Sequence, residues 1–240
     1  MRIVMFASAK TKIILLLVLF ILVLCLGTAL FIPRAQPAAG VTSVQMLPLA
    51  GKVFVLDPGH GGYDPGVMQD NVLEKQIVLE IALKLRHYLQ SAGARVVMTR
   101  ETDRDFLTVA GGPKKQQDMK NRMQIANEAK PDLFLSIHIN SINSAVWHGA
   151  QTFYKSNCEQ SKGAAEKIQK QLIRVLANTD RAVKAGDFYV LNNMESAAVL
   201  VECGFLSNPQ EAELLADPAY QSKIAWSVYL GLVSFYSPAF

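Results

Sequence analysis

The sequence predicts an α/β fold: a single three-layer α/β/α domain in which helices cover both faces of a largely parallel central sheet. Short apolar runs alternate along the chain with longer runs whose apolar residues recur at helical spacing, as expected for successive βαβ units. The apolar runs are continuous, which is typical of parallel strands that are buried on both faces. A longer apolar segment near the N-terminus stands apart from this pattern and predicts a transmembrane or signal helix before the domain.

The predicted elements begin with a strand over residues 52–56, which Asp-Pro-Gly closes. A helix is expected over 73–90, because its apolar residues form a stripe with four-residue spacing. Residues 101–120 are polar, contain Gly-Gly-Pro and are expected to form a loop. The remaining runs predict strands at 94–99, 133–139, 150–154, 188–191 and 197–201, and helices at 121–129, 161–176, 209–216 and 220–235.

Residues 1–34 form the predicted membrane anchor or signal segment. The run 13–32 is uncharged and mostly aliphatic, and about 20 helical residues cross a hydrocarbon core of ~30 Å. Basic residues precede this run, which favours a cytoplasmic N-terminus. The alternative is a secretory signal that is cleaved near residues 35–39, where small residues gather. Both alternatives place the rest of the chain outside the cytoplasm, either anchored to the membrane or secreted.

Residues 35–50 are interpreted as a linker, and residues 51–240 as one folded domain. The charge is divided unevenly between these parts. Four of the 24 basic residues lie in 1–34, which has no acidic residue, so that 20 basic residues remain against 20 acidic residues. The domain is therefore formally neutral. The basic isoelectric point belongs to the membrane-proximal segment, and we expect no nucleic-acid partner.

The cysteines leave two alternatives open. Cys25 lies in the apolar segment, and the domain contains Cys158 and Cys203. An oxidising compartment would permit one disulfide between this pair, but their spacing does not establish it. The other alternative is that both are unpaired structural residues. The chain has no Cys-x-x-Cys or other cysteine-based metal motif.

Two histidines and a glutamate are candidate metal ligands. His60 follows the first strand in a glycine-rich turn, His138 ends the strand at 133–139, and Glu74 opens the first helix. Two imidazoles and one carboxylate are a typical protein ligand set for catalytic zinc, which keeps a fourth position for water and supports hydrolysis. Taken singly, Glu74 is better explained as an acid at a helix N-terminus, and His138 is equally well explained as a core histidine.

Glu202 is a candidate general base. It follows the apolar run Ala-Ala-Val-Leu-Val, and a carboxylate at the end of a buried strand is costly unless it is paired or used. The alternatives are therefore a structural salt bridge and a base whose pKa the site adjusts. His87, which lies in the middle of a helix, and His148, which lies in a loop, do not stand at strand ends and are excluded as ligands.

Separated motifs in the chain resemble the zinc-dependent N-acetylmuramoyl-L-alanine amidases over about residues 51–236. They are Asp-Pro-Gly-His-Gly-Gly at 57–62, Glu74, Ser-Ile-His-Ile-Asn at 136–140 and Val-Glu-Cys-Gly-Phe-Leu-Ser-Asn at 201–208. Within the family the chain is most similar to the germination-specific, or sporulation, amidases of endospore-forming bacteria. That similarity rests on residues 48–52 and 147–154, and on the short membrane-proximal N-terminus without a wall-binding repeat.

The resemblance implies that the protein hydrolyses the amide bond between N-acetylmuramic acid and L-alanine and removes stem peptides during spore cortex maturation. It implies that His60, Glu74 and His138 bind Zn²⁺, that Glu202 is the catalytic acid–base group, and that Asn140 orients the site. The implied partners are peptidoglycan glycan strands with stem peptides and, through the N-terminal segment, the membrane. An activating protein partner is left open. Zinc carboxypeptidases, sugar deacetylases and a silent wall-binding module remain as alternatives.

Overall fold

The computed structural model describes residues 9–30, 47–108 and 111–237. The chain divides into two units, Met1–Gln45 and Met46–Phe240. The first unit contains helix α1 (Ala9–Leu30). No helix in the described part of the chain has both the length and the apolar character needed to cross a membrane. The predicted run 13–32 extends beyond the described residues, and most of the predicted linker 35–50 lies outside them. Both stay predictions.

The second unit is built on a six-stranded sheet with the order β4-β1-β5-β8-β6-β7. The strands are β1 (Val53–Pro58), β4 (Arg95–Met98), β5 (Leu133–Asn140), β6 (Gln151–Tyr154), β7 (Lys184–Ala185) and β8 (Ala198–Phe205). The first four strands of that order are parallel, whereas β6 pairs antiparallel with β8 and parallel with β7. The predicted, largely parallel sheet is confirmed. The direction reverses at β6 because no crossover helix joins it to β5.

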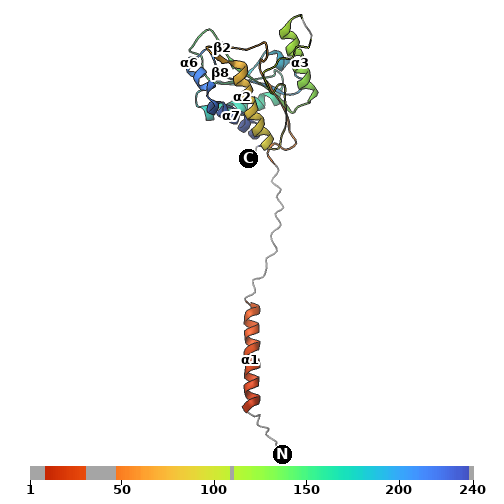
Figure 1. Ribbon diagram of the computed structural model, residues 1–240, viewed down its shortest axis with the longest axis vertical. Helices are drawn as coiled ribbons and strands as arrows, with labels where there is room; N and C mark the ends of the chain where they lie inside the picture. The colour runs from red at the N-terminus through yellow and green to blue at the C-terminus, as the bar shows by residue number, and fades with distance from the viewer. Residues whose placement is uncertain (1–8, 31–46, 109–110, 238–240) are drawn as a thin grey trace, which may run out of the picture. The chain divides into compact units, whose positions relative to one another are not determined.

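Helices cover both faces of this sheet. They are α2 (Glu74–Ser91), α3 (Lys114–Glu128), α4 (Glu159–Leu176), α5 (Tyr189–Asn192), α6 (Pro209–Ala216) and α7 (Pro218–Tyr236). Helix α7 packs against both α2 and α4, and α3 lies apart from α2 and α7 (Figure 1). Successive strand residues point to opposite layers: Phe54 and Leu56 join the core under α2, α4 and α7, and Val55 joins the core under α3 and α5.

A second, two-stranded sheet was not predicted from the sequence. Strands β2 (Met68–Gln69) and β3 (Val72–Leu73) pair antiparallel around Asp70, which has a left-handed backbone with φ 52°. Each strand has two residues, which is too short for a periodic signal. This hairpin leads directly into α2 and so helps to place the first residue of that helix, Glu74.

Two predicted boundaries and one predicted element type were wrong. Helix α3 begins at Lys114, inside the predicted loop 101–120. The prediction missed its first turn because that turn is exposed and shows no apolar stripe. Residues 188–191 were predicted to form a strand, yet α5 occupies most of this segment. The prediction failed because a short apolar run does not distinguish a buried strand from a buried helix. Strand β8 continues to Phe205 through Glu202, so that this carboxylate lies within the strand and not after it.

Close packing of α4 on α7 gives a stability prediction. A Cβ atom on Gly231 would lie 2.5 Å from the Ile168 backbone Cα atom. We expect Gly231→Ala to destabilise the domain by about 1–3 kcal/mol, because the two helices must move apart. Gly163→Ala is the matched control, since its Cβ atom would meet only the Phe235 ring, at 3.0 Å, and alanine favours a helix by about 1 kcal/mol. Equal losses of Tm in the two variants would contradict this account.

Candidate metal centre

Adjacent parallel strands bring the predicted site residues to one edge of the sheet. His60 lies just beyond the carboxyl end of β1, and His138 lies near the carboxyl end of β5. Glu202 of β8 is the direct register partner of His138. The carboxyl ends of parallel strands meet at one edge, which is where open α/β sheets place their ligands. Glu74, the first residue of α2, joins this edge from the sequence that follows the small hairpin.

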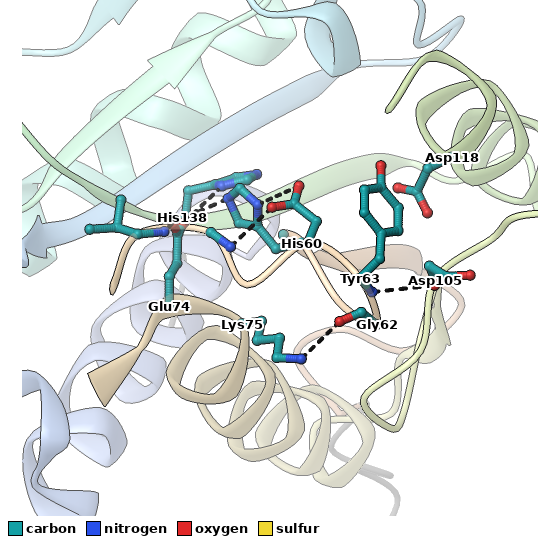
Figure 2. A network of polar contacts seen from close by, with 12 residues as sticks. His60, Gly62, Tyr63, Glu74, Lys75, Asp105, Asp118 and His138 are labelled. Carbon is teal, nitrogen blue, oxygen red and sulfur yellow. Dashed lines mark hydrogen bonds and ion pairs between the residues drawn. The ribbon is translucent and has the colours of Figure 1, made fainter. Parts of the chain in front are cut away.

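Glu74 bridges the two histidines. Its Oε2 atom lies 3.2 Å from His60 Nε2, and its Oε1 atom lies 3.1 Å from His138 Nδ1. The imidazole rings meet edge to face with their centroids 5.0 Å apart. Ligand atoms of the three residues all lie within 4.8 Å of one another, so the three converge on a common space (Figure 2). Two imidazole nitrogens and a carboxylate oxygen in this arrangement suit a divalent cation such as zinc.

The Glu74 carboxylate is fixed by backbone donors as well. The Val67 amide donates to Oε2 and the Ile139 amide to Oε1, both at 2.9 Å. Burial by itself raises the pKa of Glu74, but hydrogen bonds and charge from His138 and His60 outweigh it and hold the pKa well below its usual range. The side chain is therefore a carboxylate at all physiological pH values, in the protonation state that a metal ligand needs.

His60 is held from its other side by Asp64. The Nδ1 atom of His60 lies 2.9 Å from Asp64 Oδ2. Burial lowers the pKa of His60, whereas Glu74 and Asp64 raise it by a larger total amount. A carboxylate behind a ligating histidine fixes the orientation and tautomer of the ring. Sequence reasoning missed Asp64, although it opens a second Asp-Pro-Gly triplet, at 64–66, seven residues after the first triplet begins at Asp57.

Two glycines leave room for the side chains of the candidate ligands. A Cβ atom on Gly59 would lie 2.5 Å from His138 Nδ1, and one on Gly66 would lie 2.6 Å from Glu74 Oε2. Gly66 also has a positive φ of 69°, which other residues adopt only with strain. The glycines beside the Asp-Pro pairs therefore serve the close approach of side chains to the backbone.

Glu202 lies beside this group in a different electrostatic state. It is 8% exposed, and its Oε2 atom has no hydrogen-bond partner among the described residues. Burial raises the pKa of Glu202 to about 7; the charge of Glu74 adds to this rise, and His138 and His60 oppose it. In the part of the chain that the structure describes, Glu202 makes no ion pair, so the structural salt bridge considered from the sequence is not observed.

The four predicted site residues line a single groove. Its other lining residues include Lys115 of α3, Asn140 at the end of β5, Ser141 after it, and Phe188 before α5. An adjoining cavity shares His60 and His138 with this groove and extends beneath α3 to Arg122 and Asp118. The site is thus open to a substrate on one side and backed by buried charges on the other.

The remaining histidines and cysteines lie outside this group. His87 is exposed on α2 and His148 is exposed in the segment between β5 and β6, and neither belongs to the convergent group. Cys158 and Cys203 are free thiols, so of the two alternatives considered from the sequence the structure shows the unpaired one.

Buried charges under the site were also missed from the sequence. Asp57 is 1% exposed and accepts hydrogen bonds from Thr99 and Ser136, both at 2.8 Å, and from Arg122 at 2.8 Å. Burial raises the pKa of Asp57, but Arg122 and Thr99 outweigh it and lower the pKa below its usual value. Arg100 directly follows the predicted strand 94–99, a position that could have marked it; Arg122 lies in a helix and carries no such signal.

Comparison with known proteins gives consistent matches. The family model described as Amidase_3, N-acetylmuramoyl-L-alanine amidase, matches residues 54–234. The germination-specific N-acetylmuramoyl-L-alanine amidase of Bacillus subtilis (strain 168) is 43% identical over 195 residues, which cover 80% of this chain and 82% of that protein.

Solved structures share the fold. The CwlD amidase from Clostridioides difficile, in complex with the GerS lipoprotein, superposes with a TM-score of 0.75 at 39% identity and covers 78% of this chain and 99% of that chain. An N-acetylmuramoyl-L-alanine amidase from Clostridium difficile 630 has a TM-score of 0.69 at 30% identity and covers 78% of this chain and 97% of that chain.

The convergence of His60, Glu74 and His138 predicts a loss of metal when any one of them is removed. Replacing each by alanine deletes one of three protein donors, so we expect substoichiometric zinc in all three purified variants and stoichiometric zinc in the unchanged protein. Elemental analysis by mass spectrometry measures this. His87→Ala and His148→Ala, which remove exposed histidines, are the matched controls and should keep their zinc. Full zinc content in the three ligand variants would exclude the site.

Proposed function

The chain belongs to the N-acetylmuramoyl-L-alanine amidase family, and we propose that it uses zinc and Glu202 for the reaction of that family. The reaction is hydrolysis of the amide bond between N-acetylmuramic acid and L-alanine in peptidoglycan. His60, Glu74 and His138 hold the zinc ion. Family membership decides against the zinc carboxypeptidases, sugar deacetylases and silent wall-binding modules that the sequence had left open.

The geometry suggests a role for each group. Bound zinc would supply a Lewis acid that lowers the pKa of a water molecule toward ~7 and stabilises negative charge on oxygen. Glu202 takes a proton from the attacking water and delivers it to the amine of L-alanine as that amine leaves. Asn140 lines the same groove and orients the site. The products are a glycan strand without the peptide and a stem peptide with a free L-alanine amino terminus.

The observation that carries the role of Glu202 is its lack of a partner. A buried carboxylate that pairs with nothing within the described residues, and that faces the groove of the metal ligands, is costly unless the reaction uses it. Its pKa of about 7 suits a group that must both accept and donate a proton near neutral pH. A divalent cation nearby would lower this pKa and favour the form that accepts the proton.

A role in spore cortex maturation is supported by the relatives. A curated relative, 43% identical, is named as germination-specific, and the similar CwlD amidase was solved with the GerS lipoprotein. We infer that this chain acts on cortex peptidoglycan and binds an accessory protein of its own.

We further propose that the N-terminal segment delivers the domain across the membrane. The uncharged run 13–32, preceded by Arg2, Lys10 and Lys12, supports an anchor with its N-terminus in the cytoplasm, and cleavage near 35–39 would release the same domain as a secreted protein. An enzyme of the cell wall needs its catalytic domain outside the cytoplasm, which either route achieves.

Replacement of Glu202 by glutamine tests the catalytic proposal. The variant keeps the shape of the side chain and loses the proton-accepting charge, so we expect normal folding, near-normal zinc content and a rate loss of roughly 10²–10⁴-fold. Stem-peptide release at saturating zinc measures the rate, with circular dichroism as the folding control.

Glu211→Gln is the matched control for this variant. Glu211 is also buried, but it accepts the amides of Gly149 and Phe205 and lies outside the groove. We expect it to lower Tm and leave turnover close to that of the unchanged protein. Unchanged turnover in the Glu202 variant would remove this residue from the mechanism. Joint loss of zinc and turnover would make it a ligand instead.

The membrane proposal predicts that the domain is accessible from outside. Protease added to intact protoplasts that express the full chain should digest residues 51–240, and a version without residues 1–34 should stay protected in the cytoplasm as the control. Digestion is followed by immunoblotting beside a known outer domain. If the domain of the full chain is protected while the outer control is digested, the orientation is wrong.

A further inference from the structure

Two buried arginines hold the backbone of the loop that carries His60. Arg122 donates from Nη1 to the Pro58 carbonyl and from Nη2 to the His60 carbonyl, both at 2.8 Å. Arg100 donates from Nη2 to the Gly59 carbonyl at 2.7 Å and from Nε to the Pro58 carbonyl at 3.1 Å. Three successive carbonyls therefore accept hydrogen bonds from two guanidinium groups.

The same loop is tied to α2 through Lys75. Its ammonium group donates to the Gly62 carbonyl at 2.9 Å (Figure 2), and Arg100 donates to the Lys75 carbonyl at 2.8 Å. Lys75 is the neighbour of Glu74 in the chain. The loop that carries one metal ligand and the helix turn that carries the next are thus held by one set of charged hydrogen bonds.

Burying two guanidinium groups is costly, which argues that they serve a purpose. Arg100 and Arg122 are 1% and 2% exposed. Arg122 has carboxylate partners in Asp57 at 2.8 Å and Asp118 at 3.3 Å, whereas Arg100 has none among the residues that the structure describes and is satisfied by carbonyls alone. Burial and the neighbouring Arg122 lower the pKa of Arg100 to about 10. An apolar core would avoid this cost.

The backbone of this loop needs such support. His60 has φ 59°, and Gly61 and Gly62 have φ 126° and 56°. A left-handed histidine is strained relative to the usual regions and persists only where its surroundings determine it. The direction of its ring depends on this backbone conformation, because the Cα–Cβ bond turns with φ. A small change at the His60 carbonyl would therefore move its Nε2 atom away from Glu74 and His138.

We propose that Arg100 and Arg122 are positioning residues for the metal centre: they hold the left-handed backbone at His60 and so aim its imidazole at the space shared with Glu74 and His138. The inference rests on the proposed metal role of these three residues. It assigns to the two arginines an effect on metal affinity and coordination geometry, beyond their contribution to folding.

The test uses the full-length chain, freed of metal, with Arg100→Lys and Arg122→Lys. Lysine keeps the positive charge but cannot donate to two or three carbonyls in a fixed fork. Zinc affinity is measured by competition with a chelator, and the geometry by the visible spectrum of the Co²⁺-substituted protein. We expect each variant to fold, to bind zinc roughly 10–100-fold more weakly, and to show altered cobalt bands.

Arg86→Lys is the matched control. Arg86 lies on α2 and pairs with the exposed Glu101 at 2.8 Å, so its substitution should leave both the affinity and the spectrum unchanged. Unchanged affinity and spectrum in the two buried variants would overturn the inference, and so would their failure to fold, since the arginines would then be folding residues. If the unchanged protein binds no zinc, the proposed function itself fails, which is a separate outcome.

Discussion

The site depends on the contacts of the Glu74 carboxylate. It contacts both His60 and His138 and accepts the amides of Val67 and Ile139. These contacts join the loop after β1, the small hairpin, the first turn of α2 and the end of β5. Two backbone amides and two imidazole nitrogens around one buried carboxylate restrict its orientation. The sheet brings the segments to one edge, and this side chain sets the positions of their ligand atoms relative to one another.

The pKa values of two buried glutamates at this edge are shifted in opposite directions because the two side chains differ in partners. Glu74 has hydrogen-bond donors on both oxygens, which lower its pKa, whereas Glu202 has an unpartnered oxygen within the described residues and a raised pKa. Environments that separate the pKa values of neighbouring acids commonly separate their roles. Here one carboxylate is suited to permanent negative charge beside a cation, and the other to exchanging a proton with substrate.

Sequence reasoning found the site residues that lie at the ends of apolar runs. It missed the charged residues that contact those site residues or the backbone of their loops. His60, His138 and Glu202 were recognised because a polar side chain next to a buried strand is conspicuous. The family resemblance added roles to positions that the pattern had already marked. Asp64 and Arg122 were missed because a charged residue in a loop or helix looks like solvent-exposed sequence until the tertiary structure shows what it contacts.

Fold prediction failed where local pattern and tertiary environment disagree. The first turn of α3 is exposed to solvent, so it has no apolar stripe that would predict a helix. Helix α5 is a short, largely apolar turn whose sequence resembles that of a short strand. The parallel strands and the long amphipathic helices α2 and α4 were predicted because their periodicity comes directly from their burial. The reversal at β6 depends on the path of the connection, which periodicity does not encode.

The most direct test of the account is an anomalous difference map at the zinc absorption edge, from crystals of the zinc-loaded protein. The account predicts one strong peak bound by a nitrogen of His60, a nitrogen of His138 and an oxygen of Glu74, with Glu202 beside it and outside bonding distance. A peak elsewhere, or one that Glu202 ligates in place of Glu74, would contradict it.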